Sequence, residues 1–590
     1  MPRTLAQHVF RRLQQLNCHT IHGVPGDFFL RTLDHVTTSR SKWIGNANEL
    51  CAGYAADGYA RTVSQLARHR SKDMDPSPMI GAFMTTYGVG ELSAINAVAG
   101  SQAESVPVVQ LVGTPSSKPM RQQDPSRLVH HTIPGRGMDV YSEMVDHVVC
   151  KQAHLRLAKN ANDAAEMYDD ALQTAIQRSK PVYVTLASDM VDLPVSTELL
   201  DDPIQVSRKT LDAGLVQDII KRLAQAARPL IIADALSYPF GLQAGVNELV
   251  RLTNIPAMSY TSGKGIIDEL LPSWSPDMPN TTEYSRNCDM VLVFGPLPSD
   301  TNTSRWSAIP QTENVISFNL DSVELSTMEG RSMVESSGRE ALAQLVATLR
   351  SDIELLKRVR NEAVENNKTI PQKRQPPSPA QSTTQDDFWP TMSTYLKPED
   401  TLLFANGTPL IGGRALQLPE SCQVVASPIW NAIGSMLPTA QGIAAAKRDH
   451  QLPGRTILFE GDGSFQVTCQ SLSDIIRYHL DVTIFIVNNA GYTYERYLNG
   501  MQAEYNDVPA WRYVDAASFF GAKSNDPSYP VFTKRLETWG ELLEVFADEK
   551  ANDGKGLKIF DVVMDPQDVP EAAKAGLRRA SEALKQMRGR

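Results

Sequence analysis

Short runs of β-branched and other apolar residues alternate with longer stretches of helical periodicity along most of the 590-residue chain. Such runs are typical of parallel strands buried on both faces, and the stretches between them are typical of the covering helices. The pattern therefore predicts an α/β fold with three doubly wound parallel sheets. The predicted strands are residues 20–23, 79–84, 106–113, 181–188, 229–233, 290–294, 315–319, 401–404, 455–460, 482–487 and 558–563.

Two breaks in this pattern divide the chain into three predicted domains. Residues 366–387 are rich in Pro, Gln, Ser and Thr and nearly free of apolar side chains, which is typical of an exposed linker. A softer boundary follows the predicted strand at 181–188. We therefore predict domains at 1–190, 195–350 and 388–565, with a C-terminal helix or tail at 566–590. A charged segment at 62–78 is predicted to be a surface loop.

Composition and charge narrow the classes of partner and compartment. The chain carries 57 Lys and Arg against 67 Asp and Glu, a net charge of −10. This mild acidic excess argues against nucleic acid or an anionic membrane as a partner. The six cysteines show no CxxC spacing, which favours reduced thiols. We find no apolar run of about 18 residues and no signal-peptide pattern, so the sequence predicts a cytoplasmic protein.

Two polar turns in the last predicted domain each follow a predicted strand directly. They are GDGS (461–464) and NNAGY (488–492). Doubly wound sheets bind ligands at the carboxyl ends of their strands, so the two turns are expected at one sheet edge. Mg²⁺ prefers oxygen ligands and commonly shares them with phosphates. The turns predict a magnesium site made by the carboxylate of Asp462, the side-chain carbonyl of Asn489 and the backbone carbonyl of Gly491.

The same turns predict an anion site beside the metal. Gly461 and Gly463 would let the backbone approach phosphate oxygens, and Ser464 opens a helical stretch whose N-terminus favours anions. Either turn alone is more often a tight turn without a ligand, but the pair after neighbouring strands indicates a bound diphosphate. The pair GDGS and NNAGY resembles the signature of thiamine-diphosphate enzymes. This resemblance makes thiamine diphosphate and Mg²⁺ the expected cofactors.

The first predicted domain offers the acid that thiamine chemistry requires. Glu49 precedes the Ala- and Gly-rich stretch LCAGYAADGYAR (50–61). A glutamate at a helix start is often explained by the helix dipole alone. Residues 45–61, however, resemble the pyrimidine-binding domain of the thiamine-diphosphate enzymes. The resemblance implies that Glu49 shares a proton with the pyrimidine ring. It also implies that this glutamate and the diphosphate motif come from different subunits, in a homodimer at minimum and an expected homotetramer.

Further segments narrow the resemblance to the pyruvate decarboxylase and indolepyruvate decarboxylase family of fungal type. They are HGVPGDF (22–28), residues 85–115, VHHT (129–132), WNAIG (430–434) and NAGYTYE (489–495). The resemblance covers nearly the whole chain and implies a pyrimidine-binding, a middle and a diphosphate-binding domain. The implied activity is that of a lyase, which decarboxylates a pyruvate-like 2-oxo acid without oxidation to an aldehyde and CO₂.

The family resemblance also implies roles for individual side chains. The acid–base residues that it implies are Asp27, Glu49, His130, His131 and Glu495, with His130 mainly in positioning. The cofactor contacts that it implies are Glu49, Thr408, Asn431, Ile433, Asp462, Gly463, Ser464, Asn489, Gly491 and Tyr492. Among these, Ile433 would support the bent cofactor, and the backbone carbonyl of Asn431 would orient the aminopyrimidine.

Four positions depart from the fungal family. Asn406 stands in place of a threonine, Leu410 of a small residue, Asn431 of a glycine and Tyr494 of an isoleucine. Larger groups at Leu410 and Tyr494 predict a narrow pocket that favours a short 2-oxo acid. Tyr494 could instead turn away from the pocket.

Two other functions stay open at this stage. An altered pocket that slows protonation would favour carboligation, in which a second carbonyl compound gives an acyloin. A regulator that binds thiamine diphosphate without turnover is the alternative from another class, and the retained acid–base residues argue against it. A nicotinamide-dependent dehydrogenase is disfavoured, because no GxGxxG follows a predicted strand with an acid about 20 residues further on.

Overall fold

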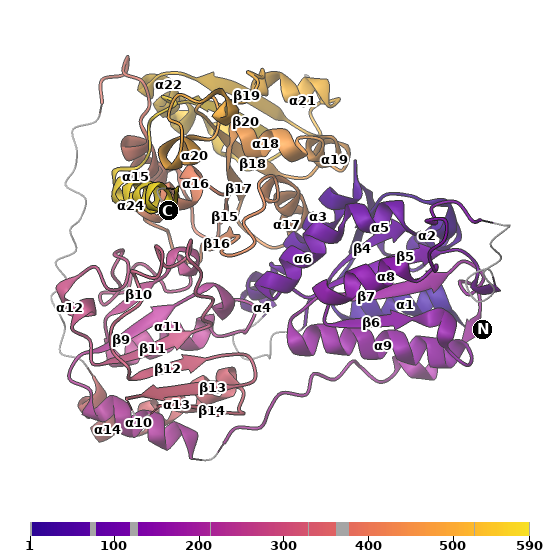
Figure 1. Ribbon diagram of the computed structural model, residues 1–590, viewed down its shortest axis with the longest axis horizontal. Coiled ribbons are helices and arrows are strands. Elements are labelled where there is room, and N and C mark those ends of the chain that lie inside the picture. The colour runs from indigo at the N-terminus through magenta and orange to yellow at the C-terminus, as the bar shows by residue number, and fades with distance from the viewer. Residues whose placement is uncertain are drawn as a thin grey trace. The chain divides into compact units, whose positions relative to one another are not determined.

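The computed structural model describes residues 3–70, 78–118, 128–212, 214–328, 330–360, 377–523 and 526–588. The chain forms two compact units. Figure 1 labels their helices and strands. The first unit holds Met1–Ser207, Ser435–Leu452 and Thr468–Leu480, and the second holds Arg208–Gly434, Pro453–Val467 and Asp481–Arg590. The predicted α/β class with parallel sheets is confirmed.

The first unit contains a six-stranded parallel sheet of order β3-β2-β4-β5-β7-β6. Its inner strands are fully buried, as their apolar sequences predict. The strands are β2 (Thr20–Gly23), β3 (Lys42–Gly45), β4 (Gly81–Thr86), β5 (Val108–Thr114), β6 (Lys151–His154) and β7 (Val182–Ala187). A short antiparallel pair is added by β1 (Arg3–Thr4) and β8 (Pro194–Val195).

Helices from two distant parts of the chain belong to this unit. They are α1 (Leu5–Gln15), α2 (Leu30–Thr38), α3 (Glu49–Ala60), α4 (Val63–Arg70), α5 (Val89–Ser93), α6 (Ile95–Glu104), α8 (Val140–Val145), α9 (Ala161–Arg178), α17 (Met436–His450) and α19 (Ser471–Arg477). Helices α3 and α17 approach so closely that a Cβ added at Gly58 would lie 2.2 Å from the carbonyl oxygen of Thr439. This close packing against α17 fixes the position of α3, the helix that begins at Glu49.

Part of the segment 62–78 differs from the predicted surface loop. Residues 63–70 form α4, and Leu66 in this helix is buried. Val63, Leu66 and Ala67 have the i, i+3, i+4 spacing of a helix face, which the charged residues around them obscure in the sequence. Residues 71–77 lie outside the described part of the chain.

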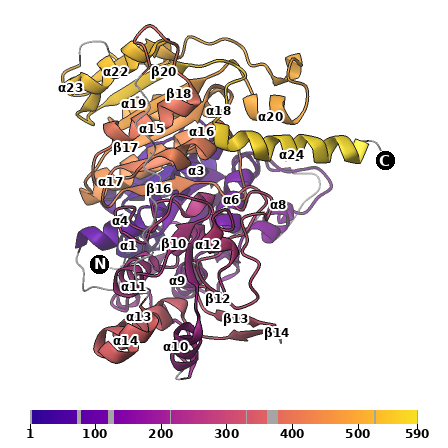
Figure 2. The same ribbon diagram turned by 90° about the vertical axis from the view of Figure 1, so that its left-hand side faces the viewer.

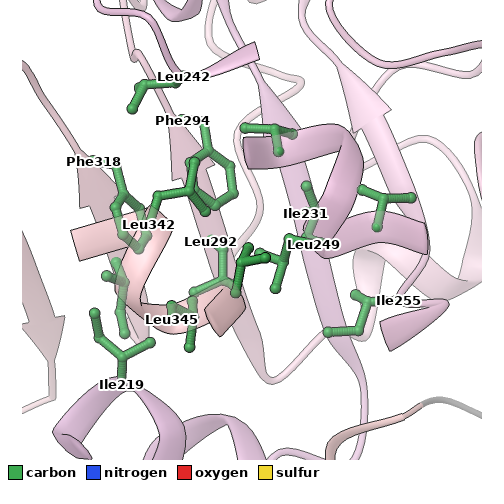
Figure 3. Packing of buried hydrophobic residues seen from close by; sticks show 14 of the residues in the cluster. Ile219, Ile231, Leu242, Leu249, Ile255, Leu292, Phe294, Phe318, Leu342 and Leu345 are labelled. Carbon is green, nitrogen blue, oxygen red and sulfur yellow. The ribbon is translucent and has the colours of Figure 1, made fainter. Parts of the chain in front are cut away.

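The second unit contains two further six-stranded sheets. The sheet of the middle region has the order β10-β9-β11-β12-β13-β14; its first four strands are parallel, and β13 and β14 add an antiparallel hairpin. The strands are β9 (Pro229–Ala233), β10 (Ala257–Ser259), β11 (Met290–Phe294), β12 (Val315–Phe318), β13 (Val323–Thr327) and β14 (Gly330–Val334). Ile231, Leu292 and Phe318 of this sheet pack against Leu249 and Leu342 from the covering helices (Figure 3).

The last sheet is parallel throughout, with the order β16-β15-β17-β18-β20-β19. Its strands are β15 (Thr401–Phe404), β16 (Gln423–Ala426), β17 (Thr456–Gly461), β18 (Val482–Asn488), β19 (Val531–Leu536) and β20 (Leu557–Val563). The helices of the second unit are α10 (Leu215–Gln225), α11 (Gln243–Thr253), α12 (Glu283–Arg286), α13 (Gly338–Ser351), α14 (Ile353–Val359), α15 (Gln385–Tyr395), α16 (Thr408–Gly412), α18 (Asp462–Thr468), α20 (Thr493–Leu498), α21 (Ala516–Phe519), α22 (Trp539–Ala547), α23 (Glu549–Asn552) and α24 (Glu571–Arg588).

The segments outside the predicted domains have different outcomes. Residues 377–384 of the predicted linker lie in neither helix nor strand, whereas its last three residues belong to α15. Residues 366–376 lie outside the described part of the chain. The C-terminal segment forms the single long helix α24 (Figure 2). Ala573 and Leu577 of this helix pack in a cluster to which Tyr494 of α20 also belongs. Among the described helices, none is long and apolar enough to cross a membrane.

A buried ion pair in the second unit, Lys264 with Glu269, also bonds to the backbone of residues 416–418, and its contribution to stability can be measured. Lys264 Nζ lies 2.7 Å from Glu269 Oε1 and donates to the carbonyl oxygen of Leu416, and Glu269 Oε2 accepts the N–H of Leu418. Lys264→Met leaves the buried Glu269 carboxylate without its close cation, so we expect a loss of about 3–5 kcal/mol in the free energy of unfolding. Denaturant unfolding measures it. The control Lys264→Met/Glu269→Leu should regain most of the loss, and an unchanged midpoint for Lys264→Met would contradict the prediction.

Candidate active site

Asp462 is the residue at which β17 passes into α18. Its carboxylate is 1% exposed and accepts hydrogen bonds from the N–H of Gly463, at 2.7 Å, and of Gly491, at 3.0 Å. Strands β17 and β18 are parallel neighbours, with Gly461 in register with Val487. The structure therefore brings the GDGS and NNAGY turns together at one sheet edge, as the sequence predicts.

The surroundings of Asp462 fit a divalent cation. Burial raises the pKa of the Asp462 carboxyl to about 6, against the lowering effect of its N–H donors. No Lys, Arg or His in the described residues forms a salt bridge with it. A Cβ added at Gly461 would meet no heavy atom within 4 Å, so the turn borders open space. Together with the buried Asn489, this set of oxygen donors suits Mg²⁺ bound to a diphosphate.

Arg496, which the sequence analysis missed, holds the second turn in place. Its buried guanidinium donates to the carbonyl oxygens of Asn489, at 3.1 Å, and Ala490, at 2.8 Å, and pairs with Asp507 at 2.6 Å. Groups behind a metal ligand orient it and so influence metal affinity. Arg496 stands one helical turn after NNAGY, and nothing in that spacing shows that its side chain folds back.

Glu460, also missed, stands directly before the GDGS turn. Its side chain is fully buried, and its Oε1 accepts the Ser464 hydroxyl at 2.7 Å. Burial raises the pKa of Glu460 to about 8, opposed by the hydrogen bond from Ser464. The Ser464 hydroxyl oxygen in turn accepts the N–H of Gly434 at 2.8 Å. A charged residue near the end of an apolar strand is the sequence signal that could have singled out Glu460.

The loop 428–434 carries two of the predicted cofactor contacts. Asn431 has a φ of 52°, a left-handed conformation that glycine adopts freely and asparagine tolerates. The Asn431 amide also donates to the hydroxyl of Thr301 at 3.2 Å, and its backbone N–H donates to Ser427. Asparagine can therefore replace the glycine of the family here. Ile433 is 42% exposed, which leaves it open to a ligand.

The turn before α16 also contains unpaired polar atoms. Thr408, predicted to lie near the cofactor, is buried at the first position of α16, after Gly407 with a φ of 91°. In the same turn, the amide nitrogen and oxygen of Asn406 are both buried and make no hydrogen bond within the described residues. Buried polar atoms normally have partners. Asn406 is thus a candidate ligand contact that the sequence analysis noted only as a departure.

Leu410 and Tyr494, which are larger than the residues of the fungal family at these positions, contribute to packing. Leu410 packs against the hydrophobic core of the last sheet, and Tyr494 packs beside Leu577 of α24. Burial raises the pKa of Tyr494. The narrowing of the substrate pocket by these residues stays a prediction. Glu495, the next residue on α20, is exposed.

In the first unit, Glu49 is the first residue of α3 and is half-buried. The helix start is fixed by Asn48, whose side-chain oxygen accepts the N–H of Cys51 at 2.8 Å. The carboxylate lies against α5, because a Cβ added at Gly90 would stand 3.0 Å from Glu49 Oε1. Asp474 accepts the N–H of Ala47 and so holds the preceding turn.

Asp27, His130 and His131 come together in the same unit. His130 Nε2 lies 2.8 Å from Asp27 Oδ2, and the His130 ring stacks on Phe28 at a centroid distance of 4.6 Å. His131 has a φ of 67°, and its ring lies 4.6 Å from that of His130. The ligating atoms of the three residues all lie within 4.8 Å of one another. The side chains of Asp27 and His130 are more than half exposed, as the prediction that they contact a substrate requires.

Glu91 supplies a test by pH in the first unit. The buried Glu91 carboxyl accepts the N–H of Gly88 at 2.6 Å and the hydroxyl of Tyr183 at 2.5 Å. Burial raises the pKa of Glu91 to about 7. The unfolded carboxyl loses its proton near pH 4.5, so from there to about pH 7 the folded state binds more protons and its stability falls as pH rises. Glu91→Gln, which resembles the protonated form, should lack this loss.

We therefore expect the unfolding free energy of the wild type to fall by a few kcal/mol between pH 5 and pH 8, relative to that of Glu91→Gln. Thermal unfolding of both proteins at the two pH values measures the difference. Parallel changes in the two proteins would contradict the prediction.

The predicted site residues are divided between the two units. The first unit holds Asp27, Glu49, His130 and His131, and the second holds Thr408, Asn431, Ile433, Asp462, Gly463, Ser464, Asn489, Gly491, Tyr492 and Glu495. Within the second unit, hydrogen bonds join the GDGS turn to two other segments. The N–H of Gly491 donates to Asp462, and the N–H of Gly434, at the end of the 428–434 loop, donates to the Ser464 hydroxyl. Within the first unit Asp27 contacts His130. The chemical role of each residue stays a prediction.

Comparison with known proteins identifies the class of this chain. Models of the thiamine pyrophosphate enzymes match the chain as the N-terminal TPP binding domain at residues 3–133, the central domain at 216–345 and the C-terminal TPP binding domain at 408–546. A solved thiamin diphosphate-dependent enzyme from Mycobacterium smegmatis has the same fold, with a TM-score of 0.73 at 17% identity over 96% of this chain and 100% of that one. The three family models define the class as thiamine pyrophosphate enzymes.

Curated relatives refine the class. A pyruvate decarboxylase of Aspergillus parasiticus is 38% identical over 96% of each chain, and one of Aspergillus fumigatus is 33% identical over 97% of this chain and 96% of that one. Pyruvate decarboxylase isozyme 2 of Saccharomyces cerevisiae is 32% identical over 96% of each chain. The chain therefore belongs to the pyruvate decarboxylase family.

Proposed function

We propose that this protein is a magnesium- and thiamine-diphosphate-dependent lyase that converts a pyruvate-like 2-oxo acid to an aldehyde and CO₂. The observation that carries the proposal is the Asp462 turn, where a buried carboxylate without a cation partner in the described residues borders open space. The contact of Asp27 with His130 beside His131 supports decarboxylation rather than cofactor binding alone. The names of the curated relatives support the same substrate class.

In this proposal Asp462, Asn489 and Gly491 hold Mg²⁺ through oxygen atoms, and Gly463, Ser464 and Tyr492 line the diphosphate. Thr408, Asn431 and Ile433 contact the rest of the cofactor. Bound thiamine diphosphate supplies the nucleophile for the 2-oxo carbon and the electron sink for the departing CO₂.

The acid–base residues hold and move protons. Glu49 holds a proton at its carboxyl for exchange with the aminopyrimidine. Asp27, His131 and Glu495 bind the substrate carboxylate and deliver a proton to the product, and His130 positions Asp27 through their 2.8 Å contact. An imidazole suits this work because its ordinary pKa lies near neutrality.

The assembly we propose is a homodimer at minimum, with a homotetramer expected, in which Glu49 of one subunit serves the diphosphate site of another. Support comes from the family resemblance, which implies that this glutamate and the diphosphate motif come from different subunits. The partners proposed are a small-molecule substrate and copies of this chain, with neither nucleic acid nor membrane, and the compartment proposed is the cytoplasm. The net charge of −10 agrees with the absence of a nucleic-acid partner.

A substrate panel tests the proposal. Purified protein with Mg²⁺ and thiamine diphosphate is incubated with 2-oxo acids of increasing size, and CO₂, aldehyde and acyloin are measured separately. We expect CO₂ and aldehyde in equal amounts from pyruvate or a similarly short acid. Acyloin as the main product would favour the carboligase, and saturable cofactor binding without turnover would favour the regulator.

A further inference from the structure

Glu460 occupies a position where a carboxyl is energetically unfavourable. It belongs to β17, whose residues Thr456–Phe459 are all buried, and its own side chain is fully buried. Burying a carboxyl costs free energy that an apolar side chain of similar size would avoid. A contribution to function is therefore needed to explain this residue.

The contacts of Glu460 lead through one hydroxyl to another part of the chain. The Ser464 hydroxyl donates to Glu460 Oε1 at 2.7 Å and accepts the N–H of Gly434 at 2.8 Å. A serine hydroxyl has a single hydrogen to donate. With that hydrogen given to Glu460, the Ser464 oxygen presents its lone pairs toward Gly434. Glu460 Oε2 is buried and has no partner within the described residues.

The two ends of this connection carry different parts of the candidate site. Ser464 belongs to the turn of Asp462, which we assign to Mg²⁺ and the diphosphate. Gly434, with a φ of 81°, ends the loop that carries Asn431 and Ile433, which we assign to the other end of the cofactor. The beginning of that loop is held separately, because the hydroxyls of Ser299 and Thr301 donate to the carbonyl oxygen of Pro428.

We propose that Glu460 is a positioning residue: through the Ser464 hydroxyl it fixes Gly434, and with it the loop of Asn431 and Ile433, relative to the Asp462 turn. The inference rests on the proposed cofactor, because a ligand that spans both segments binds best when their separation is set in advance. It extends the proposed function to a residue outside the set predicted from sequence.

The test compares four variants of the full-length protein: Glu460→Leu, Glu460→Gln, Ser464→Ala and the double variant Glu460→Leu/Ser464→Ala. Calorimetric titration with thiamine diphosphate at saturating Mg²⁺ gives the Kd without turnover. We expect Glu460→Leu to raise this Kd roughly tenfold, the worth of one hydrogen bond between fixed groups, and not to lower the thermal midpoint of the apoprotein. Glu460→Gln, which keeps an oxygen for the Ser464 hydroxyl, is the conservative control and should stay close to wild type.

The double variant shows whether the two residues act through each other. If they do, its Kd should equal that of Ser464→Ala rather than the product of the two single effects. Fluorescence of Trp430 in the same loop, isolated by comparison with Trp430→Phe, should change in Glu460→Leu apoprotein but not in Glu460→Gln. This signal reports the loop position before any ligand is bound.

An unchanged Kd in Glu460→Leu, or single effects that multiply in the double variant, would overturn the inference. So would a Kd that rises only in proportion to lost thermal stability. If Glu460→Leu does not fold, the Trp430 fluorescence of Ser464→Ala apoprotein decides: it must change, because this variant removes the same connection to Gly434, and no direct contact of Ser464 with the cofactor affects a signal measured without ligand. Wild-type protein that binds the cofactor without decarboxylating any 2-oxo acid would contradict the proposed function and leave this test intact.

Discussion

Glu49→Gln is expected to lower kcat by a factor of about 10²–10⁴ while the Kd for thiamine diphosphate changes little. The amide keeps the size of the side chain at the start of α3 but cannot hold and return a proton. The groups that we assign to the diphosphate and Mg²⁺ belong to the second unit, so the substitution leaves them untouched. Steady-state kinetics and calorimetric titration of the same preparation give both quantities.

A matched control shows whether the loss of kcat is specific to Glu49 or follows from the removal of any carboxylate in this unit. Glu143→Gln removes an exposed carboxylate from α8 of the same unit and should leave both kcat and Kd at the wild-type values. Equal losses of binding and activity in Glu49→Gln would refute the division of labour between the two halves of the site.

Asp462→Asn is expected to have the opposite profile. The amide keeps the length of the side chain and an oxygen for one N–H donor, but the negative charge that faces the metal is lost. We expect the apparent affinity for Mg²⁺ at saturating thiamine diphosphate to fall at least roughly 100-fold, and the bound cofactor to be lost with it. Mg²⁺ titration of the apoprotein, followed by activity or by calorimetry, measures the change.

Asp515→Asn is a suitable control, because it removes a half-exposed carboxylate from the same domain at a distance in sequence from the GDGS and NNAGY turns. It should titrate with Mg²⁺ as the wild type does. An Asp462→Asn protein that keeps wild-type Mg²⁺ dependence would show that this carboxylate is not a metal ligand.

The central strands of each sheet could be predicted from the sequence, whereas the strands at the edges could not. Central strands are buried on both faces and therefore form continuous apolar runs, as Val482–Asn488 does. An edge strand such as Lys151–His154 needs no such run, because one side of it faces solvent. The edge strands absent from the prediction are β3, β6, β10, β14, β16 and β19, together with β1 and β8 of the two-stranded sheet. The hairpin strand β13 was also missed.

Contacts that depend on strand order could be predicted, and those between distant loops could not. Asp462 and Asn489 each follow a strand in consecutive strand–helix–strand order, so parallel topology places their turns at one edge. The link from Gly434 to Ser464, and that from Thr301 to Pro428, join loops whose approach is set by tertiary packing. Arg496 and Glu460 contact residues close to them in sequence, but the direction in which each side chain folds is set by the turn that it contacts, and the sequence does not show this.

Complementation between two inactive variants tests most directly whether each site is shared by two subunits. Glu49→Gln and Asp462→Asn chains, carrying different tags, are co-expressed, and mixed assemblies are purified by both tags. If each site takes Glu49 from one subunit and Asp462 from another, every mixed dimer contains one fully wild-type site, and we expect about half of the wild-type kcat per dimer. If both residues of a site come from the same chain, no wild-type site forms. Mixed assemblies as inactive as the two parents would therefore contradict the account.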